Sequence, residues 1–218
     1  MNHLSGLDRL ANRFSIMRHG QSKANARGLI VSRIENDRRG DYGLSELWTA
    51  SRRSRWRGAA ACPGTRPVIC SSDFSRAWQT AEIARAHLGA PEAVIAEALR
   101  GRCFGDWEAS ATGNYAQVWA ADETNPCYAS GNVEPTTAVL DRSTAFIVDL
   151  ERRYSGRDIL LVSHGDTLQI LQAGFLRMNP SQHRSLPELK NAEIRRLRLP
   201  ARGPIPAPLL ESGGQQPV

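Results

Sequence analysis

FSIMRHGQS, residues 14–22, joins a short apolar run directly to a turn that carries basic and polar side chains. The run at 14–17 is typical of a strand buried inside a parallel sheet. Arg18, His19 and Gly20 follow this run without a gap. The chain therefore presents a histidine and an arginine where a buried strand ends.

Two later stretches repeat this arrangement. Residues 68–70 are apolar and lead into a serine-rich turn, and residues 74–87 behind them read as a helix. Residues 159–162 are apolar and lead into Ser163-His164-Gly165, with a helix-like stretch at 167–175. Strands that alternate with helices predict an α/β fold: a three-layer α/β/α sandwich around a mostly parallel central sheet.

The three turns are expected to converge, because ligands of open α/β sheets bind outside the carboxyl ends of the strands. Ser72 or Asp73 is predicted to cap the second helix, and Asp166 or Thr167 the third. Exposed amides at such helix starts favour anions. The sequence thus predicts an anion site built from segments that lie far apart along the chain.

Further elements are expected between these units. Residues 44–57 read as a helix with Ser45 as N-cap, ended by Pro63 and Gly64. A strand is predicted around 93–96 and a late edge strand at 194–199. Residues 104–135 mix helix and loop signals and are expected to form a lid insertion over the strand ends.

One domain is predicted over residues 1–200, because no linker-like stretch divides it. Residues 201–218 are rich in proline and glycine and are expected to form a flexible tail. No apolar stretch approaches the roughly 18 residues that a membrane span needs, and residues 1–13 lack the apolar core of a secretory signal. A cytoplasmic protein is expected, and nothing in the sequence specifies its oligomeric state.

The cysteines are predicted to be reduced and structural. Their spacing indicates neither a zinc site nor a disulfide framework. The four are Cys62, Cys70, Cys103 and Cys127.

The net charge of +6 comes almost wholly from arginine, since Lys23 and Lys190 are the only lysines. Arginine suits phosphorylated partners because its planar fork matches phosphate oxygens bidentately. A basic balance alone does not indicate nucleic-acid binding. Four arginines, at 52, 53, 55 and 57, lie close together on one predicted helix. They fit a solvated helical face as well as a nucleic-acid-binding surface.

The residues themselves allow phosphoryl chemistry. A neutral imidazole is a good nucleophile, and neighbouring guanidinium charge favours the neutral form of His19. Arg18 and Arg76 would hold the oxygens of a transferring phosphoryl group, and a cationic His164 would add a third donor. A lone histidine after a strand is usually a turn residue whose hydrogen bonds are satisfied locally. The phosphoryl-transfer interpretation therefore depends on the combination of two His-Gly turns and an arginine turn at three strand ends.

The same residues resemble the motifs of a known family. Residues 18–25 are similar to the Arg-His-Gly-(Glu/Gln)-(Ser/Thr)-x-x-Asn signature of the histidine phosphatase superfamily, also called phosphoglycerate-mutase-like. Residues 71–81 resemble its second arginine motif and residues 162–166 its second histidine motif. Weaker likenesses lie at 42–45 and at 133–134 with Arg142, so the resemblance extends over residues 14–175.

This resemblance implies a phosphatase acting on a small-molecule or peptidyl phosphomonoester, without a metal or other cofactor. A phosphohistidine would form on His19 and be hydrolysed by water. The implied phosphate ligands are Arg18, Asn25, Arg76 and His164. Further binding candidates from the two histidine motifs are Gln21, Ser22 and Gly165.

One position departs from the family pattern. Members usually carry a glutamate that protonates the leaving oxygen and then activates water, and residues 99–108, LRGRCFGDWE, place Gly101 there. General acid–base catalysis is typically worth about 10²–10⁴-fold. We therefore expect nitrophenyl and acyl phosphates to react best and mutase activity to be disfavoured. Candidates for a displaced acid are Asp106, Glu108 and Asp166. The alternative is that Asp106 and Glu108 are solvated carboxylates and that Asp166 caps a helix.

A second interpretation stays open. With Gly101 in place of the acid and the binding residues kept, the chain would also fit a pseudo-enzyme that binds phosphate or a phosphorylated partner without turnover.

Overall fold

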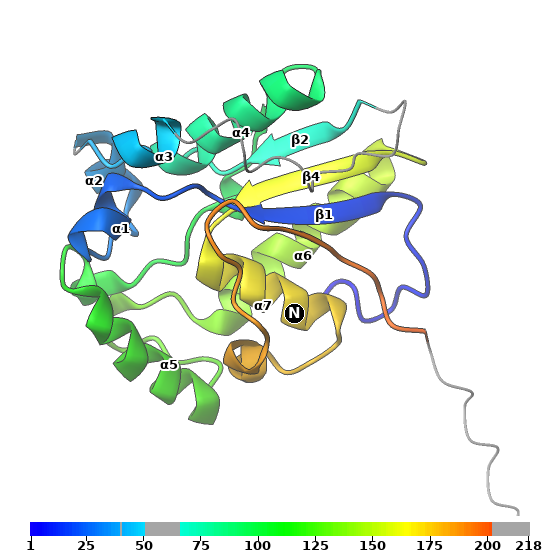
Figure 1. Ribbon diagram of the computed structural model, residues 1–218. Helices are drawn as coiled ribbons and strands as arrows, with labels where there is room; N and C mark the ends of the chain where they lie inside the picture. Colours follow the sequence, from blue (N-terminus) through cyan, green and yellow to red (C-terminus); the bar gives the residue numbers. More distant parts are fainter. Residues whose placement is uncertain (40, 51–65, 202–218) are drawn as a thin grey trace, which may run out of the picture.

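One five-stranded sheet runs through the centre of the computed structural model, which describes residues 1–39, 41–50 and 66–201 (Figure 1). The strands lie in the order β3-β2-β4-β1-β5. They span β1 Arg13–Arg18, β2 Val68–Ser71, β3 Val94–Ile95, β4 Asp158–Ser163 and β5 Ile194–Arg196. All neighbours pair in parallel except β5, which runs antiparallel to β1. The predicted mostly parallel sheet is confirmed.

Side chains alternate between the two faces of the sheet, so each face has its own helical layer. Phe14 and Ile16 of β1 pack with α6 (Thr136–Arg153) and α7 (Gly165–Phe175). Met17 joins the opposite cluster, with α4 (Ser75–Leu88). Figure 1 shows α4 on one side of the sheet and α6 and α7 on the other. The predicted three-layer sandwich is therefore present.

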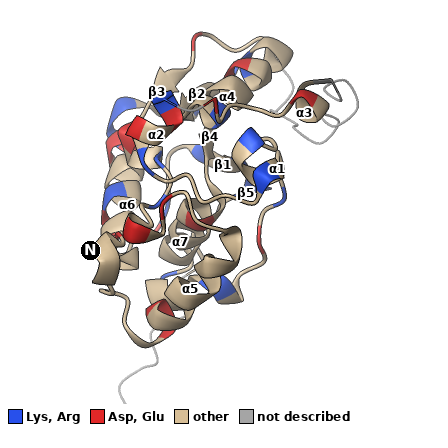
Figure 2. Cartoon of the chain, turned by 90° about the vertical axis from the view of Figure 1, so that its left-hand side faces the viewer, with Lys and Arg blue, Asp and Glu red and all other residues tan. Residues whose placement is uncertain are grey.

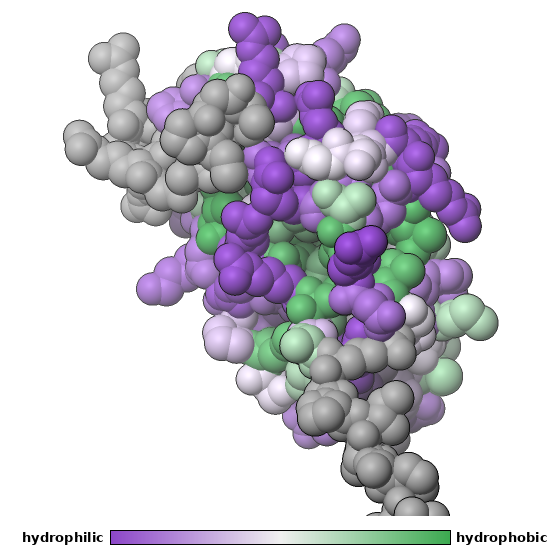
Figure 3. All heavy atoms as spheres, turned by 90° about the vertical axis from the view of Figure 1, so that its right-hand side faces the viewer, coloured by the Kyte–Doolittle hydropathy of each residue, from purple (hydrophilic) through white to green (hydrophobic). Residues whose placement is uncertain are grey.

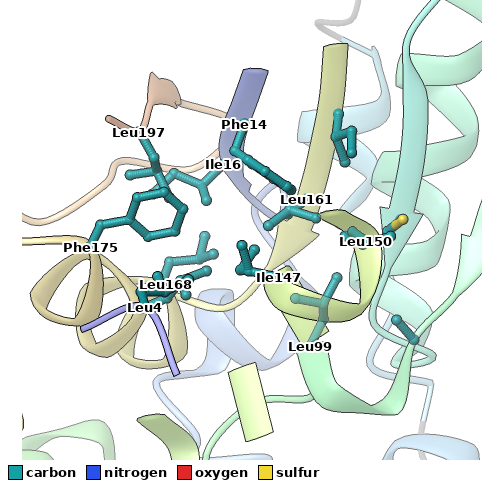
Figure 4. Close-up of a cluster of buried hydrophobic side chains, with 14 of the residues drawn as sticks. Leu4, Phe14, Ile16, Leu99, Ile147, Leu150, Leu161, Leu168, Phe175 and Leu197 are labelled. Atoms are coloured by element: carbon teal, nitrogen blue, oxygen red, sulfur yellow. The ribbon is translucent and has the colours of Figure 1, made fainter. Parts of the chain in front are cut away.

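The larger core lies between the sheet and the α6–α7 layer (Figure 4). Phe14 meets Phe175 edge to face, with ring centroids 6.2 Å apart. Ile147 and Leu161 are fully buried between them and the rest of the cluster. Burial of such side chains contributes about 1.5–3 kcal/mol each, so this layer fixes the sheet on which the strand-end turns are carried.

Four short helices and a 3₁₀ turn stand at or beyond the carboxyl ends of the parallel strands. Figure 2 looks onto this end of the sheet, with α1 and α2 in its upper half and α5 in its lower half. The elements are α1 Lys23–Arg27, α2 Ile34–Arg39, α3 Glu46–Ala50, α5 Tyr115–Thr124 and the 3₁₀ turn η6 Pro180–Ser185.

The helix predicted at 44–57 begins as expected, since the Ser45 hydroxyl accepts a hydrogen bond from the Trp48 amide at 3.3 Å. Residues 51–65, with the four crowded arginines, Pro63 and Gly64, lie outside the described residues. The late edge strand exists but is shorter than 194–199, and it pairs only with Ser15–Met17 of β1.

The predicted helix caps are wrong. Phe74 is the N-cap of α4, and its side chain makes no capping bond. The acceptor comes instead from α2, where Asp37 receives the Ser75 amide at 2.7 Å. His164 is the N-cap of α7, so Asp166 lies inside its first turn. Tertiary contacts override local capping preference here, because a buried carboxylate from another helix already satisfies the orphan amide.

Residues 104–135 form α5 and several 3₁₀ turns around a small core of their own. Ile30, Phe104, Val118 and Val133 are buried together in it. The segment is fixed to the sheet end by a fully buried ion pair, in which Arg102 donates to both oxygens of Asp122 at 2.6 and 2.7 Å. This segment is thereby placed over the strand ends.

The opposite end of the molecule is mainly hydrophilic, with a smaller group of hydrophobic side chains between the polar ones (Figure 3).

Cys70, Cys103 and Cys127 are free thiols, and Cys62 lies outside the described residues. So do residues 202–218, which hold nearly all of the expected tail. None of the helices in the described part of the chain is long and apolar enough to cross a membrane.

Candidate active site

The structure brings the three strand-end turns together around one cavity of about 220 Å³. Arg18 ends β1 opposite Ser163 of β4, so His19 and His164 follow in parallel from adjacent strands. The two imidazole rings lie 5.1 Å apart and meet edge to face. Arg76 enters from the first turn of α4, and its Nε lies 3.3 Å from Nε2 of His19. Three segments far apart in sequence thus contribute to one pocket.

His19 is held in a single tautomer. Its Nδ1 lies 2.7 Å from the Gly20 carbonyl oxygen, which only accepts, so the ring proton is on Nδ1. Nε2 then carries the lone pair and accepts from Arg76. Burial first, and then the charges of Arg76 and Arg18, hold the pKa of His19 well below its usual value. The ring is therefore neutral near pH 7, with its nucleophilic nitrogen in the cavity wall.

The turn itself requires Gly20. A Cβ at this position would lie 2.4 Å from the Trp48 ring, closer than real contacts allow. The Gly20 amide donates to the Thr80 hydroxyl of α4 at 2.9 Å. Trp48 of α3 and Thr80 of α4 therefore fix the backbone that carries His19.

Arg76 is buried, and the protein holds its guanidinium group through the two terminal nitrogens. Its Nη1 donates to Asp37 at 3.1 Å and its Nη2 to the Val31 carbonyl at 2.9 Å. Asp37 is a buried residue of α2 and also accepts from the Ser75 hydroxyl at 3.1 Å. Two of the three guanidinium nitrogens are thus fixed by the protein, and Nε is left toward His19.

Arg18 is held in a similar way by the segment before β5. Its Nη1 donates to Glu188 and to the Leu189 carbonyl, both at 2.8 Å. Its Nε is buried and has no hydrogen-bond partner within the described residues. Arg18 and Arg76 are therefore each anchored by one carboxylate and one carbonyl oxygen.

His164 also has one free nitrogen. Its Nε2 lies 3.0 Å from the Ser72 hydroxyl oxygen, whereas its buried Nδ1 has no partner in the part of the chain that the structure describes. Burial first, and then Arg76 and His19, hold the pKa of His164 well below its usual value. The structure therefore favours a neutral ring rather than the cationic one expected in a complex.

Three of the four other predicted ligands line the cavity, and the fourth does not. Asn25 and Ser22 line the cavity and cap α1 reciprocally, through bonds of 3.1 and 3.0 Å. Gly165 also lines it, beside the Arg18 guanidinium. Gln21 is not among the lining residues, and its side-chain oxygen accepts from Ser45 at 3.0 Å. Its placement indicates a role in holding the turn.

Gly101 lies in the cavity wall beside His164. A Cβ at this position would lie 3.2 Å from Cγ of the His164 ring, a tight contact that a shift of a few tenths of an ångström would relieve. The glycine therefore leaves the wall open here, next to the second histidine.

Two of the three candidate acids lie outside the cavity lining. Asp106 accepts from Asn132 at 3.0 Å. Glu108 accepts from the amide and hydroxyl of Ser32, at 2.8 and 2.5 Å, and from Asn36. Both carboxylates are committed to neighbouring polar groups.

Asp166 does line the cavity, but it is an acceptor of three bonds. His183 and Trp119 each lie 3.0 Å from it, and Arg102 lies 3.3 Å away. Burial opposes its charge, yet the bond from His183 and the charge of Arg102 hold its pKa well below the usual range. Asp166 is therefore ionised at any pH near neutrality and has no proton to give.

Sequence reasoning did not single out several residues of this site. Asp37 and Glu188 anchor the two arginines, and Tyr115 and Arg184 complete the cavity wall from the far side. None belongs to a motif, because each is brought to the pocket by the tertiary fold.

Comparison with known proteins identifies the family of this chain. The sequence pattern of the Histidine phosphatase superfamily (branch 1) matches residues 14–206. Over 192 residues the chain is 26% identical to phosphoglycerate mutase-like protein 4 of Arabidopsis thaliana, covering 84% of this chain and 78% of that protein. It is 27% identical over 187 residues to the metal-independent phosphoserine phosphatase of the same plant, covering 82% and 73%.

Solved structures show the same fold. A mycobacterial glucosyl-3-phosphoglycerate phosphatase superposes with a TM-score of 0.67 at 24% identity, covering 84% of this chain and 88% of that one. A protein described as mycobacterial hydrolase 1 gives the same TM-score at 23% identity, covering 85% and 91%.

Proposed function

Because this chain belongs to the histidine phosphatase superfamily (branch 1), we propose that it hydrolyses phosphomonoesters through a phosphohistidine on His19, without a metal ion. The observation that carries the proposal is the neutral His19, whose Nε2 meets Arg76 in a cavity that Arg18 and His164 also line. A nucleophile among fixed positive donors is what phosphoryl transfer requires.

The unpartnered nitrogens support an oxyanion as the ligand. Nε of Arg18 and Nδ1 of His164 are buried polar atoms without partners within the described residues. A buried donor left unsatisfied costs about 1–3 kcal/mol, which bound phosphoryl oxygens would remove. When the Ser72 hydroxyl donates to Nε2 of His164, the ring proton is on Nδ1, and the neutral ring is a donor. A cationic His164 is therefore not needed.

The reaction proceeds in two steps. Nε2 of His19 attacks phosphorus while the ester P–O bond breaks, and the guanidinium groups of Arg18 and Arg76 stabilise the charge on the phosphoryl oxygens. Water then attacks phosphorus, the P–N bond breaks, and its electron pair returns to Nε2. Asn25, Ser22 and Gly165 border the same cavity and are proposed to contact the phosphate or the substrate; Gln21 is proposed to hold the turn.

A small-molecule or peptidyl phosphate is the proposed substrate, and the cytoplasm the proposed location. One relative is named for phosphoserine, and the site is a cavity of about 220 Å³ rather than a long groove. Efficient mutase activity is not proposed, because Gly101 supplies no carboxylic acid for an alkyl leaving group.

The experiment uses isotopically labelled acetyl phosphate and p-nitrophenyl phosphate, with and without a chelator. We expect an acid-labile, base-stable phosphoprotein, followed by release of phosphate, in both conditions. His19→Ala should abolish both steps, whereas His3→Ala, which changes a histidine on the surface beside Asp141, should leave them intact. Equal label in His19→Ala and the unaltered protein would contradict the proposal.

The second candidate function is a phosphate-binding pseudo-enzyme, favoured by the missing side chain at Gly101. It predicts label on His19 that is trapped but not released, or phosphate binding with no label. Release of phosphate at many turnovers per molecule would exclude it.

A further inference from the structure

Gly101 leaves the proposed phosphatase without its expected proton donor, and the carboxylates in the cavity wall do not replace it. These carboxylates are Asp166 and Glu188. Asp166 is ionised, as shown above. Glu188 is half exposed and ion-paired with Arg18 at 2.8 Å. Both carboxylates are therefore already engaged as acceptors by basic side chains.

Tyr115 lies on the same wall, in the first turn of α5, and its ring is fixed from two sides. It stacks on Trp119, with centroids 5.2 Å apart and an interplanar angle of 13°. Phe104 meets it edge to face, with centroids 4.6 Å apart. The orientation of the phenol is therefore set by packing.

No hydrogen bond holds the hydroxyl itself in the part of the chain that the structure describes, although the ring lines the cavity. The Ser32 hydroxyl in this wall donates its proton to Glu108, whereas the Ser22 hydroxyl accepts from the Asn25 amide and, like that of Thr112, is an alkyl hydroxyl. Thr112 also lines the cavity, but an alkyl hydroxyl gives up its proton far less readily than a phenol, whose pKa is about 10. Tyr115 is the acidic hydroxyl that remains available.

Tyr115 lines the same cavity as Arg18 and Arg76. Burial raises the pKa of Tyr115 to about 12, and the nearby charges of Arg76 and Arg18 oppose that rise. Tyr115 is thus protonated near pH 7, and the positive charges of Arg76 and Arg18 favour its phenolate form.

We propose that the Tyr115 hydroxyl donates the proton to the leaving oxygen, in place of the side chain absent at Gly101. This inference rests on the phosphatase reaction proposed above. It assigns a catalytic role to a residue of the α5 segment, and so links residues 104–135 to chemistry as well as to enclosure of the pocket.

The proton balance is complete over the two steps. As Nε2 of His19 bonds to phosphorus, the ester P–O bond breaks and the departing oxygen takes the Tyr115 proton, which releases an alcohol and leaves a phenolate. Water then attacks the phosphohistidine and gives one proton to that phenolate, while the P–N electrons return to His19. Tyrosine is among the side chains that perform such general acid–base catalysis.

The test is Tyr115→Phe, which keeps the ring contacts and removes only the hydroxyl. We measure kcat/KM for nitrophenyl, phenyl and alkyl phosphates, in order of increasing leaving-group pKa. The variant should lose on the order of 10²-fold with alkyl phosphates and less than about three-fold with nitrophenyl phosphate. The matched control is Tyr128→Phe, because Tyr128 packs on the same small core but does not line the cavity.

A positioning role would give a different result. If Tyr115 only supports the pocket, Tyr115→Phe will lower all three rates by the same factor, and the proposal is wrong. It is equally wrong if alkyl phosphate hydrolysis is unchanged. Thermal unfolding of both variants checks that the fold is retained. Failure of the underlying phosphatase reaction is recognised separately, because the unaltered protein would then neither form phosphohistidine nor hydrolyse nitrophenyl phosphate.

Discussion

Gly101 and the His164 ring lie against each other, and this contact decides what a side chain at position 101 would do. The first carbon of any side chain would meet the ring at 3.2 Å. A carboxylate restored here would thus stand beside the second histidine, at the cost of a small movement of the ring. The effect on chemistry and the effect on packing can be separated by two substitutions.

Gly101→Glu should raise the rate with alkyl phosphates by about 10-fold or more and flatten the dependence of rate on leaving-group pKa, because a carboxylic acid gives up its proton more readily than the Tyr115 phenol. Gly101→Ala introduces the same tight contact without the acid and should lower all rates slightly. In the same series the unaltered protein, with Tyr115 as its donor, should depend on leaving-group pKa more steeply than Gly101→Glu and less steeply than Tyr115→Phe. If Gly101→Glu and Gly101→Ala behave alike, the missing carboxylate is not what limits the reaction.

Asp37 is the second residue whose chemistry can be tested alone. Asp37→Asn removes the negative charge from a pair whose side chains are 7% and 2% exposed. Loss of one partner of a buried ion pair costs about 3–5 kcal/mol, so urea unfolding should show a loss near that size, with weaker phosphate binding.

The control for Asp37 is Asp149→Asn on the surface of α6, where the partner Arg153 is mostly exposed. Exposed pairs contribute about 0.2–1 kcal/mol, so this variant should be nearly unchanged. Equal losses in the two variants would show that Asp37 does not hold Arg76.

Strand ends were predictable from the sequence, but the anchors around them were not. Apolar runs that end in polar turns are local, so the positions of His19 and His164 follow from pattern and from the rule that parallel strands end together. Asp37, Glu188 and Tyr115 reach the pocket only through packing of α2, α5 and the segment before β5. Local preference likewise misassigned the cap of α4, whose acceptor comes from 38 residues away.

The α5 segment offers a test of how such an element is held. Arg102 and Asp122 are both fully buried, and Asp122→Asn should lower the free energy of unfolding by about 3 kcal/mol. It should also lower kcat, because Tyr115 lies on the same helix. The double variant Arg102→Met with Asp122→Leu should lose less stability than the single one, since both members of the pair are removed and Asp166 keeps its contacts with His183 and Trp119. Additive losses would contradict this account.

Stability of the whole molecule should depend on pH through the two pocket histidines. Burial and arginine charge lower the pKa of His19 and of His164 in the folded chain, whereas an unfolded histidine titrates near 6.5. Below about pH 6.5 the unfolded chain binds protons that the folded chain does not. The free energy of unfolding should therefore be greatest above that pH and fall as pH drops.

Urea unfolding between pH 7.5 and about 5, in a buffer free of phosphate, measures this slope. Each group contributes up to about 1.4 kcal/mol per pH unit below its unfolded pKa. His19→Asn should flatten the slope, and His3→Gln, which changes a partly exposed histidine outside the pocket, should not. Parallel curves for His19→Asn and the unaltered protein would show that burial does not suppress protonation of His19.

The central place of β4 has a consequence for synthesis of the protein. β4 pairs with β1 on one side and with β2 on the other, yet it leaves the ribosome last of the three. Until then β1 has no paired strand and β2 can pair only with the two-residue β3, and such unpaired strand edges invite aggregation or a chaperone. Folding must wait for these long-range pairings, so the pocket and the sheet arise together, late in translation.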